Sequence, residues 1–183
     1  MAIRTRLSIE EFLCGDWPPG AQLIDGEVIV NDPTLKHQEI AKRILYALET
    51  WIRAEADRGR VGWGGNWTVA PGHVYKPDVW WTPSERILDL DAGRHDEPPA
   101  LVVEVRSSGT WRFDVGRKRD VYERAGVREL WLVDTPASTV LVFRRNTSES
   151  SEFDTDAEFG PGATLTTPLL EGFELAVDEL FGD

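Results

Sequence analysis

Apolar residues in the first third of the chain follow the period of an α-helix. They recur at spacings of three and four residues, which places them along one side of a helix. The positions are Ile40, Ile44, Leu48, Trp51 and Ile52. We therefore predict a long helix over about residues 35–57 with one buried face, and Gly59 marks its end.

Shorter apolar runs, bounded by Gly, Pro, Asn and Asp, follow the two-residue period of β-strands. Asp25-Gly26 is typical of a two-residue turn, so residues 22–30 are predicted to form a hairpin. Further strands are predicted at 61–69, 75–81 with Asp78 inside it, 100–106, 129–134, 139–144, 164–165 and 173–175. Helices are predicted after Ser8, which fits a capping box with Glu11, over 114–125 up to Gly126, and at 177–181. The polar stretch 146–158 predicts a mobile loop or a weak strand.

The order of these elements indicates an α/β fold. The strand at 100–106, the helix at 114–125 and the strand at 129–134 form a strand–helix–strand unit, which joins two parallel strands. The hairpins add antiparallel strands, so we expect a mixed sheet flanked by helices. The 183 residues contain no repeat or linker and suit one hydrophobic core. We predict a single domain over residues 1–183.

Composition limits the setting in which the protein works. Hydrophobic residues make up 41% of the chain, which favours a folded protein. No apolar run approaches the ~20 residues of a membrane span, and the N-terminal segment lacks the apolar stretch of a signal peptide. The single cysteine, Cys14, excludes an internal disulfide. We predict a cytoplasmic protein with no membrane partner. The net charge of −12 argues against broad nucleic-acid binding through a basic surface.

Glu104 lies in the middle of an apolar strand. Because side chains alternate along a strand, one face of 101–105 is purely apolar and the other carries Glu104 together with Arg106. A buried charge without a partner costs several kcal/mol or shifts its pKa. A metal ion, Arg106 or Lys118 could compensate this carboxylate.

Asp78 follows a proline in another predicted strand. If this strand lies beside the one at 100–106, Asp78 and Glu104 can approach each other and share a divalent cation. Mg²⁺ favours one or two carboxylates completed by water and phosphate oxygens. Carboxylate sites of this kind suit metal-assisted displacement at phosphorus.

Asp114, Lys118 and Tyr122 are spaced four residues apart on the helix that follows, so they line one face. Lys118 could orient a metal-bound water or stabilise the negative charge of a transition state. Tyr122 could bind a phosphate or simply pack. The same spacing also fits an Asp114–Lys118 ion pair within the helix and a tyrosine at the edge of the core.

The densest group of positive residues surrounds Glu104 in the sequence. Its members are Arg106, Arg112, Arg117, Lys118 and Arg119, with Arg124 and Arg128 beyond them. A solvated helix face with ordinary Arg–Glu pairs explains such a group as well as a local patch for nucleic acid does. In the second interpretation, Arg112 and Arg117 bind substrate together with Tyr122.

An ordered set of motifs resembles the Uma-two family of restriction-endonuclease-like proteins, which is grouped with the PD-(D/E)XK nucleases. The set comprises Pro77-Asp78, PALVVEVRS at 99–107, the pattern DxxxKxxxY at 114–122 and GVRELWLVD at 126–134. The LIDGE hairpin at 23–27 and His37 also resemble that family. The resemblance extends from about Ser8 to the end of the chain. It implies a restriction-endonuclease-like core with additional β-hairpins.

The resemblance also implies a site in which Asp78 and Glu104 hold Mg²⁺ or Mn²⁺. In the family pattern the residue after the acid, here Val105, contributes its backbone carbonyl to the metal, and Glu27 could complete the metal shell. The basic residue two positions after the acid is usually lysine, but here it is Arg106, which cannot act as a base. Either Lys118 takes over that role, or Arg106 only stabilises charge, or the site is inactive; we favour Lys118.

The remaining histidine and tryptophan residues give weaker signals. His37 could reach the site from the start of its helix and bind substrate, although a capping or surface role also fits its position. Trp80 and Trp81 should point to opposite faces of their strand. We expect one of them in the core and the other to be free to stack on a base or pack against a second subunit.

We therefore predict a metal-dependent endonuclease that hydrolyses phosphodiester bonds of DNA, with Lys118 and Arg106 stabilising negative charge. Because cutting both strands takes two sites, a homodimer is expected. The second hypothesis is a non-catalytic binding or assembly module that retains the nuclease fold, which the acidity and Arg106 favour. A glycosidase using Asp78 and Glu104 is the third and least favoured, because such enzymes hold their acids in an open sugar cleft.

Overall fold

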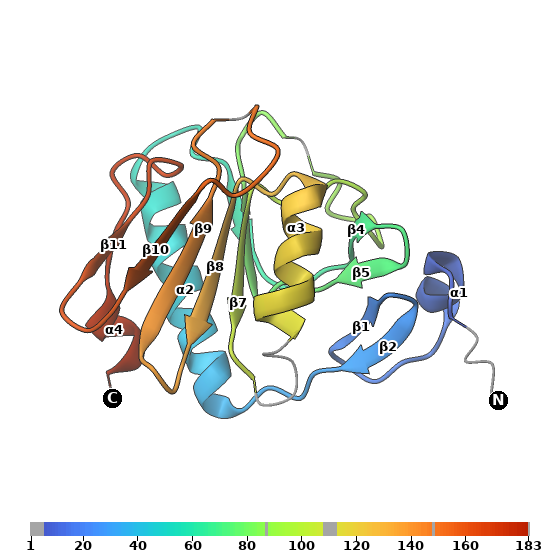
Figure 1. The fold of residues 1–183 in the computed structure, drawn as a ribbon. Helices are drawn as coiled ribbons and strands as arrows, with labels where there is room; N and C mark the ends of the chain where they lie inside the picture. The colour runs from blue at the N-terminus through green and yellow to red at the C-terminus, as the bar shows by residue number, and fades with distance from the viewer. Residues whose placement is uncertain (1–5, 87, 108–112, 148, 183) are drawn as a thin grey trace.

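A six-stranded sheet lies at the centre of the protein (Figure 1). The structure, a computed structural model, describes residues 6–86, 88–107, 113–147 and 149–182. The strands in spatial order are β10 (Thr155–Phe159), β9 (Thr139–Arg144), β8 (Glu129–Asp134), β7 (Leu101–Val105), β6 (Val79–Thr82) and β3 (Arg60–Gly62). β7 and β8 are parallel, and the other neighbouring pairs are antiparallel. The predicted α/β class and mixed sheet are confirmed.

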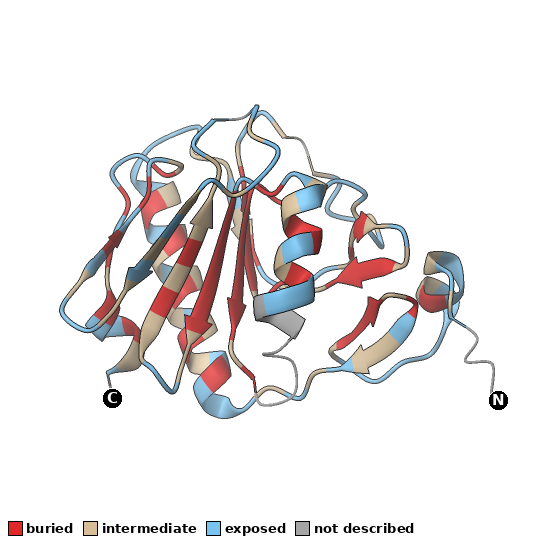
Figure 2. Cartoon of the chain, in the orientation of Figure 1, coloured by how far each residue is buried: buried red, intermediate tan, exposed pale blue. Residues whose placement is uncertain are grey.

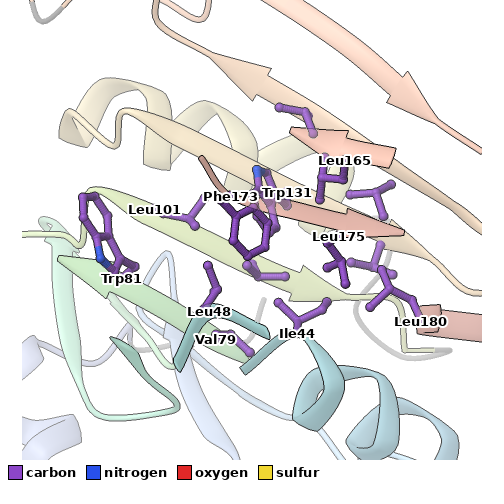
Figure 3. Packing of buried hydrophobic residues seen from close by; sticks show 14 of the residues in the cluster. Ile44, Leu48, Val79, Trp81, Leu101, Trp131, Leu165, Phe173, Leu175 and Leu180 are labelled. Carbon is purple, nitrogen blue, oxygen red and sulfur yellow. The ribbon is translucent and has the colours of Figure 1, made fainter. Parts of the chain in front are cut away.

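One face of this sheet is covered by α2 (Leu35–Ala54), by the hairpin of β11 (Thr164–Thr166) and β12 (Glu174–Ala176), and by α4 (Val177–Phe181). Their apolar side chains meet those of the sheet in what we call the α2-side core (Figure 3). It includes Ile44, Leu48, Leu101, Val103, Trp131 and Phe173. The predicted apolar stripe of the long helix supplies this contact.

The opposite face is covered by η1 (Phe113–Lys118), a π-helical segment, and by α3 (Arg119–Ala125). A four-stranded sheet lies beside them in the order β2 (Glu27–Val30), β1 (Ala21–Ile24), β5 (His73–Tyr75) and β4 (Trp67–Ala70). We call the buried cluster on this face the α3-side core. It includes Trp67, Tyr75, Val102, Val121, Tyr122 and Leu132. β7 and β8 are buried along nearly their whole length between the two cores (Figure 2).

The N-terminal elements follow their local sequence signals. α1 (Ile9–Cys14) begins at Ser8, whose side chain and that of Glu11 form the predicted capping box. In the β1–β2 turn, Asp25 and Gly26 have φ angles of 52° and 74°, as a two-residue hairpin turn requires. None of the helices in the described part of the chain combines the length and the apolar character needed to cross a bilayer.

Several predicted boundaries were wrong. The long helix ends at Ala54 rather than at residue 57. The strand predicted over 61–69 is divided between β3 and β4, which belong to different sheets. The strand predicted over 75–81 is likewise divided at 76–78 into β5 and β6, so Asp78 precedes a strand instead of lying inside one. For the polar stretch 146–158, predicted as a mobile loop or a weak strand, the strand alternative holds at residues 155–158, which belong to β10 and pair with β9.

Candidate active site

Asp78 lies where the chain passes from the four-stranded sheet to the six-stranded sheet. Pro77 precedes it and has no N–H to donate to a sheet, and β6 begins at the next residue. β6 and β7 are antiparallel neighbours. Asp78, which precedes β6, therefore lies beside the C-terminal end of β7. Its Oδ2 accepts a hydrogen bond of 2.7 Å from the backbone N–H of Val105. The predicted proximity of Asp78 to the strand of Glu104 is confirmed.

Glu104 is buried on the face of β7 that is covered by α3, with 3% of its surface exposed. Its Oε1 accepts hydrogen bonds from Lys118 Nζ at 3.1 Å and from the Tyr122 hydroxyl at 2.8 Å. Lys118 is itself only 1% exposed. Lys118 is therefore a partner of this carboxylate, and Arg106 donates to Asp134 Oδ1 at 2.7 Å.

The four-residue spacing predicted a uniform α-helix around Lys118, but the structure differs. Residues 113–118 form π-helix and α-helix follows from Arg119. π-Helical turns are rare and occur frequently at functional sites. Lys118 ends this segment, and Tyr122 lies in the α-helix beyond it, so both reach the same oxygen of Glu104. Asp114, the first residue of the predicted trio, lies within η1.

His37 is buried in the first turn of α2, with 4% exposed, so a surface role is wrong. Its backbone N–H is capped by Thr34 Oγ1 at 3.2 Å, while its side-chain Nε2 lies 3.0 Å from Asp78 Oδ2. Burial by itself lowers the pKa of His37, but the hydrogen bond and charge of Asp78, the charge of Glu104 and the Val105 carbonyl raise it above its ordinary value. The ring therefore holds a proton more firmly than a free imidazole does.

The groups that raise the pKa of His37 are also oxygen donors suited to a divalent cation. They are the carboxylates of Asp78 and Glu104 and the carbonyl of Val105. Two carboxylates and a carbonyl fit Mg²⁺ or Mn²⁺ when water and phosphate oxygens complete the shell. In the described ranges, no group of three or more His, Cys, Asp and Glu side chains could hold an ion alone. A cation held here would need water or substrate oxygens for its remaining ligands.

A second polar network, which the sequence did not predict, lies behind Lys118. His73 Nε2 is 3.1 Å from Asp25 Oδ1, and His73 Nδ1 is 2.9 Å from the Tyr75 hydroxyl. The Tyr75 ring in turn lies 5.5 Å from Lys118 Nζ. Burial raises the pKa of Tyr75 and, as the largest influence, lowers that of His73. The alternation His73-x-Tyr75 placed both side chains on one face, but their partner Asp25 is far away in the sequence.

Two further predicted site residues, Arg117 and Glu27, lie at the β1–β2 hairpin. Arg117 forms an ion pair with Asp25 at the hairpin turn, and Glu27 lies exposed on β2. Arg112 falls outside the described residues. Trp80 and Trp81 are both buried, 9% and 5% exposed, so the expectation that one of them was free to stack on a base was wrong. Trp80 packs in the α3-side core and Trp81 in the α2-side core.

Comparisons with known proteins agree with this architecture. The sequence model of the family Uma2, described as "Putative restriction endonuclease", matches residues 10–178. A crystal structure described as "a putative nuclease belonging to DUF820 from Anabaena variabilis ATCC 29413" superposes with a TM-score of 0.81. The two chains are 20% identical, and the match covers 96% of this chain and 97% of the other. At that identity the likeness shows a shared fold. A comparison with curated proteins gave no match.

Proposed function

The chain belongs to the Uma2 family, described as "Putative restriction endonuclease", and from that premise we propose that it is a metal-dependent nuclease that hydrolyses phosphodiester bonds of DNA. The observation that carries the proposal is the arrangement around the end of β7. Glu104 is buried against Lys118 and Tyr122, and the neighbouring residue Val105 is bonded to Asp78.

In this proposal Asp78, Glu104 and the Val105 carbonyl hold Mg²⁺ or Mn²⁺, and Glu27 stays a predicted additional ligand. When bound, such an ion lowers the pKa of a coordinated water and polarises a phosphoryl oxygen. The π-helical turn and Tyr122 keep Lys118 beside Glu104. There the ammonium group balances the carboxylate before substrate binds, and it stabilises negative charge that develops on the phosphate.

The proposed roles of the remaining residues follow from their contacts. His37 holds a proton against Asp78 Oδ2, and this contact fixes the orientation of that carboxylate. Arg106 is about one-third exposed beside Asp134. It contributes positive charge at the end of β7, and as an arginine it cannot take a proton from water.

A non-catalytic module that retains the fold is the second candidate. The observation that favours it is that Lys118 and Tyr122 already satisfy one oxygen of the buried Glu104. The net charge of −12 also favours it, because phosphate binding depends on cationic surface. A homodimer that cuts both strands of a duplex stays a prediction of the nuclease proposal.

The test is a cleavage assay on plasmid DNA and on a labelled single-stranded oligonucleotide, with Mg²⁺ or Mn²⁺. We expect cleavage by the wild type to fall about 100-fold or more in Glu104→Gln, because the substitution removes a charged ligand. The matched control is Glu152→Gln, which changes an exposed acid in a distant loop. Equal cleavage by Glu104→Gln, or no cleavage of any substrate with either ion, would reject the proposal.

A further inference from the structure

Two hollows on the α2 side of the molecule share two lining side chains, Leu45 and Trp63. The first, of about 380 Å³, is lined by His37 and Asp78 of the candidate site, by Lys42 and by Trp63. The second, of about 440 Å³, is lined by Arg60 and also by Trp63. Both volumes lie in the range of small-molecule and nucleotide pockets. Trp63 therefore stands at the boundary between the candidate site and a second hollow beyond it.

Trp63 is 71% exposed, unlike Trp67, Trp80 and Trp81, which are all buried. A single exposed apolar residue is ordinary, so its position and support carry the argument. An indole beside a proposed phosphate site can bind the base of the same nucleotide. Every nucleic-acid base has a π-face, and an aromatic side chain can stack on it whatever the sequence.

The backbone around Trp63 is fixed to the candidate site. The N–H of Gly64 donates to the carbonyl of Pro77 at 2.8 Å, and Pro77 is the residue before Asp78. The carbonyl of Gly64 accepts from the indole N–H groups of Trp67 at 3.0 Å and Trp80 at 3.1 Å. On the other side of Trp63, a Cβ at Gly62 would lie 2.3 Å from the Trp80 ring, so only glycine fits. The loop therefore holds the backbone of Trp63 at a set position relative to Asp78.

We propose that Trp63 is a stacking platform for an unpaired base of the nucleic acid whose phosphate lies at Asp78 and His37. This inference rests on the proposed nuclease function and names its substrate class. A base inside a duplex has both faces covered by its neighbours, so only a single strand, or a strand with an unpaired nucleotide, can use Trp63. Lys42, which pairs with Glu39 at 2.5 Å, and Arg60, which shares its hollow with Glu49, lie on the two sides of the indole. We assign the phosphates that flank the stacked base to these two cations.

The charge of the protein points in the same direction. With a net charge of −12, the chain is poorly suited to the broad phosphate contacts that give duplex-binding proteins their affinity and steep salt dependence. Stacking of a base on an aromatic ring adds affinity to whatever the phosphate contacts supply. A short footprint in which Trp63 supplies much of the affinity is the arrangement that an acidic nuclease of this shape can use.

The test measures binding separately from cleavage. Fluorescein-labelled oligo(dT), oligo(rU) and a DNA hairpin duplex are titrated by fluorescence anisotropy, with Ca²⁺ in place of Mg²⁺. The variants are Trp63→Ala and Trp63→Phe, with Tyr46→Ala as control. Tyr46 is 74% exposed on the same helix side of the molecule but lines neither hollow. Because Trp63 is exposed, its removal should leave the melting temperature unchanged.

We expect Trp63→Ala to weaken binding of the single strands roughly tenfold or more. Trp63→Phe should keep most of the affinity, Tyr46→Ala all of it, and the duplex should bind more weakly than either single strand. Single-strand binding by Trp63→Ala equal to that of Tyr46→Ala, or tighter binding of the duplex, overturns the inference, as does a wild type that binds none of the probes.

The two proposals can fail separately. If the wild type cleaves DNA through Glu104 but Trp63→Ala binds normally, the stacking inference is wrong and the nuclease proposal stands. If single strands bind through Trp63 but no ion supports cleavage, the nuclease proposal is wrong and the platform stands as a binding site.

Discussion

Glu104 of β7 and Glu129 of β8 are buried glutamates on neighbouring strands, and they lie on opposite faces of one sheet. Each carboxylate has lost its contact with water and needs partners within the protein. Glu104 faces α3 and shares one oxygen between Lys118 and Tyr122. Glu129 is fully buried on the α2 side. Its two oxygens accept hydrogen bonds from the Trp131 indole at 2.6 Å and the Thr167 hydroxyl at 2.5 Å, and Arg144 Nε lies 3.0 Å away.

The difference between them lies in what stands next to each carboxylate. Burial, the largest influence, raises the pKa of Glu129, and its hydrogen bonds and Arg144 only partly oppose that effect. The partners of Glu129 join β8, β9 and the segment between β11 and β12. The neighbours of Glu104 include Asp78 and His37, which line an open hollow. A buried acid is therefore no sign of function by itself. Glu104 is a candidate because its neighbours Asp78 and His37 also line a hollow.

The largest effect that separates the two acids is on stability. Glu129→Gln should lower the free energy of unfolding by about 3–5 kcal/mol, because Arg144 loses its charged partner. Cleavage per folded molecule should stay as in the wild type. Urea denaturation and an assay of the folded fraction measure the two quantities. Loss of cleavage at full stability would remove the distinction between the two sites.

Removing the cation from each pair sharpens the comparison. Lys118→Met and Arg144→Met should each cost about 3 kcal/mol, since each leaves a buried carboxylate without its charge partner. Mn²⁺ at 100 times its Kd should restore up to about 2.7 kcal/mol to Lys118→Met, because the ion binds only the folded state. Melting temperatures with and without Mn²⁺ test this. Arg144→Met keeps the candidate site, so Mn²⁺ should stabilise it to the same extent. Equal stabilisation of Glu104→Gln, which lacks a proposed ligand, would show that the ion acts elsewhere.

A smaller and matched pair removes one hydroxyl from each carboxylate. Tyr122→Phe and Thr167→Val should each lower the free energy of unfolding by about 1.5–3 kcal/mol, the usual contribution of a hydrogen bond to a charged group. We expect cleavage to fall in Tyr122→Phe only, because Tyr122 holds Glu104 next to Lys118. Equal rates for the two variants, measured at the same folded fraction, would assign Tyr122 a purely structural role.

The smallest predicted effect concerns pH. The pKa of His37 is raised in the folded protein, so the folded state binds its proton more tightly than the unfolded state does. The stabilisation is fully present below the ordinary value of 6.5 and is lost as the pH rises through the raised pKa. The stability difference between wild type and His37→Gln should therefore shrink as the pH rises above 6.5. A difference that grows with pH would have the opposite sign to this account.

Local sequence patterns were enough to predict the main helices and the central strands. The apolar stripe of α2 and the alternation in β7 and β8 are properties of contiguous residues, and the signal of Glu104 was an acid inside such a run. The sequence did not predict the burial of Glu129, because Glu129 is the first residue of its strand and an acid at that position is usually exposed to solvent. Its partner Thr167 lies 38 residues further along the chain.

The parts that the sequence did not predict depend on contacts between distant segments. His73 meets Asp25 across 48 residues, and neither residue type nor spacing signals that pair. His37 was predicted to be near the site, but only the packing of α2 against β6 and β7 shows that it is buried against Asp78. The break at Pro77 was visible in the sequence, because proline interrupts a strand, and it accounts for the wrong assignment of residues 75–81.

The central claim is that Glu104, and not Glu129, belongs to a metal site. Isothermal titration of Mn²⁺ into the wild type, Glu104→Gln and Glu129→Gln tests it directly, in the presence of a short oligonucleotide that supplies phosphate ligands. We predict binding by the wild type and by folded Glu129→Gln, and none by Glu104→Gln. Binding that survives in Glu104→Gln, or no binding by the wild type, would contradict the claim and favour a compensated, structural carboxylate at both positions.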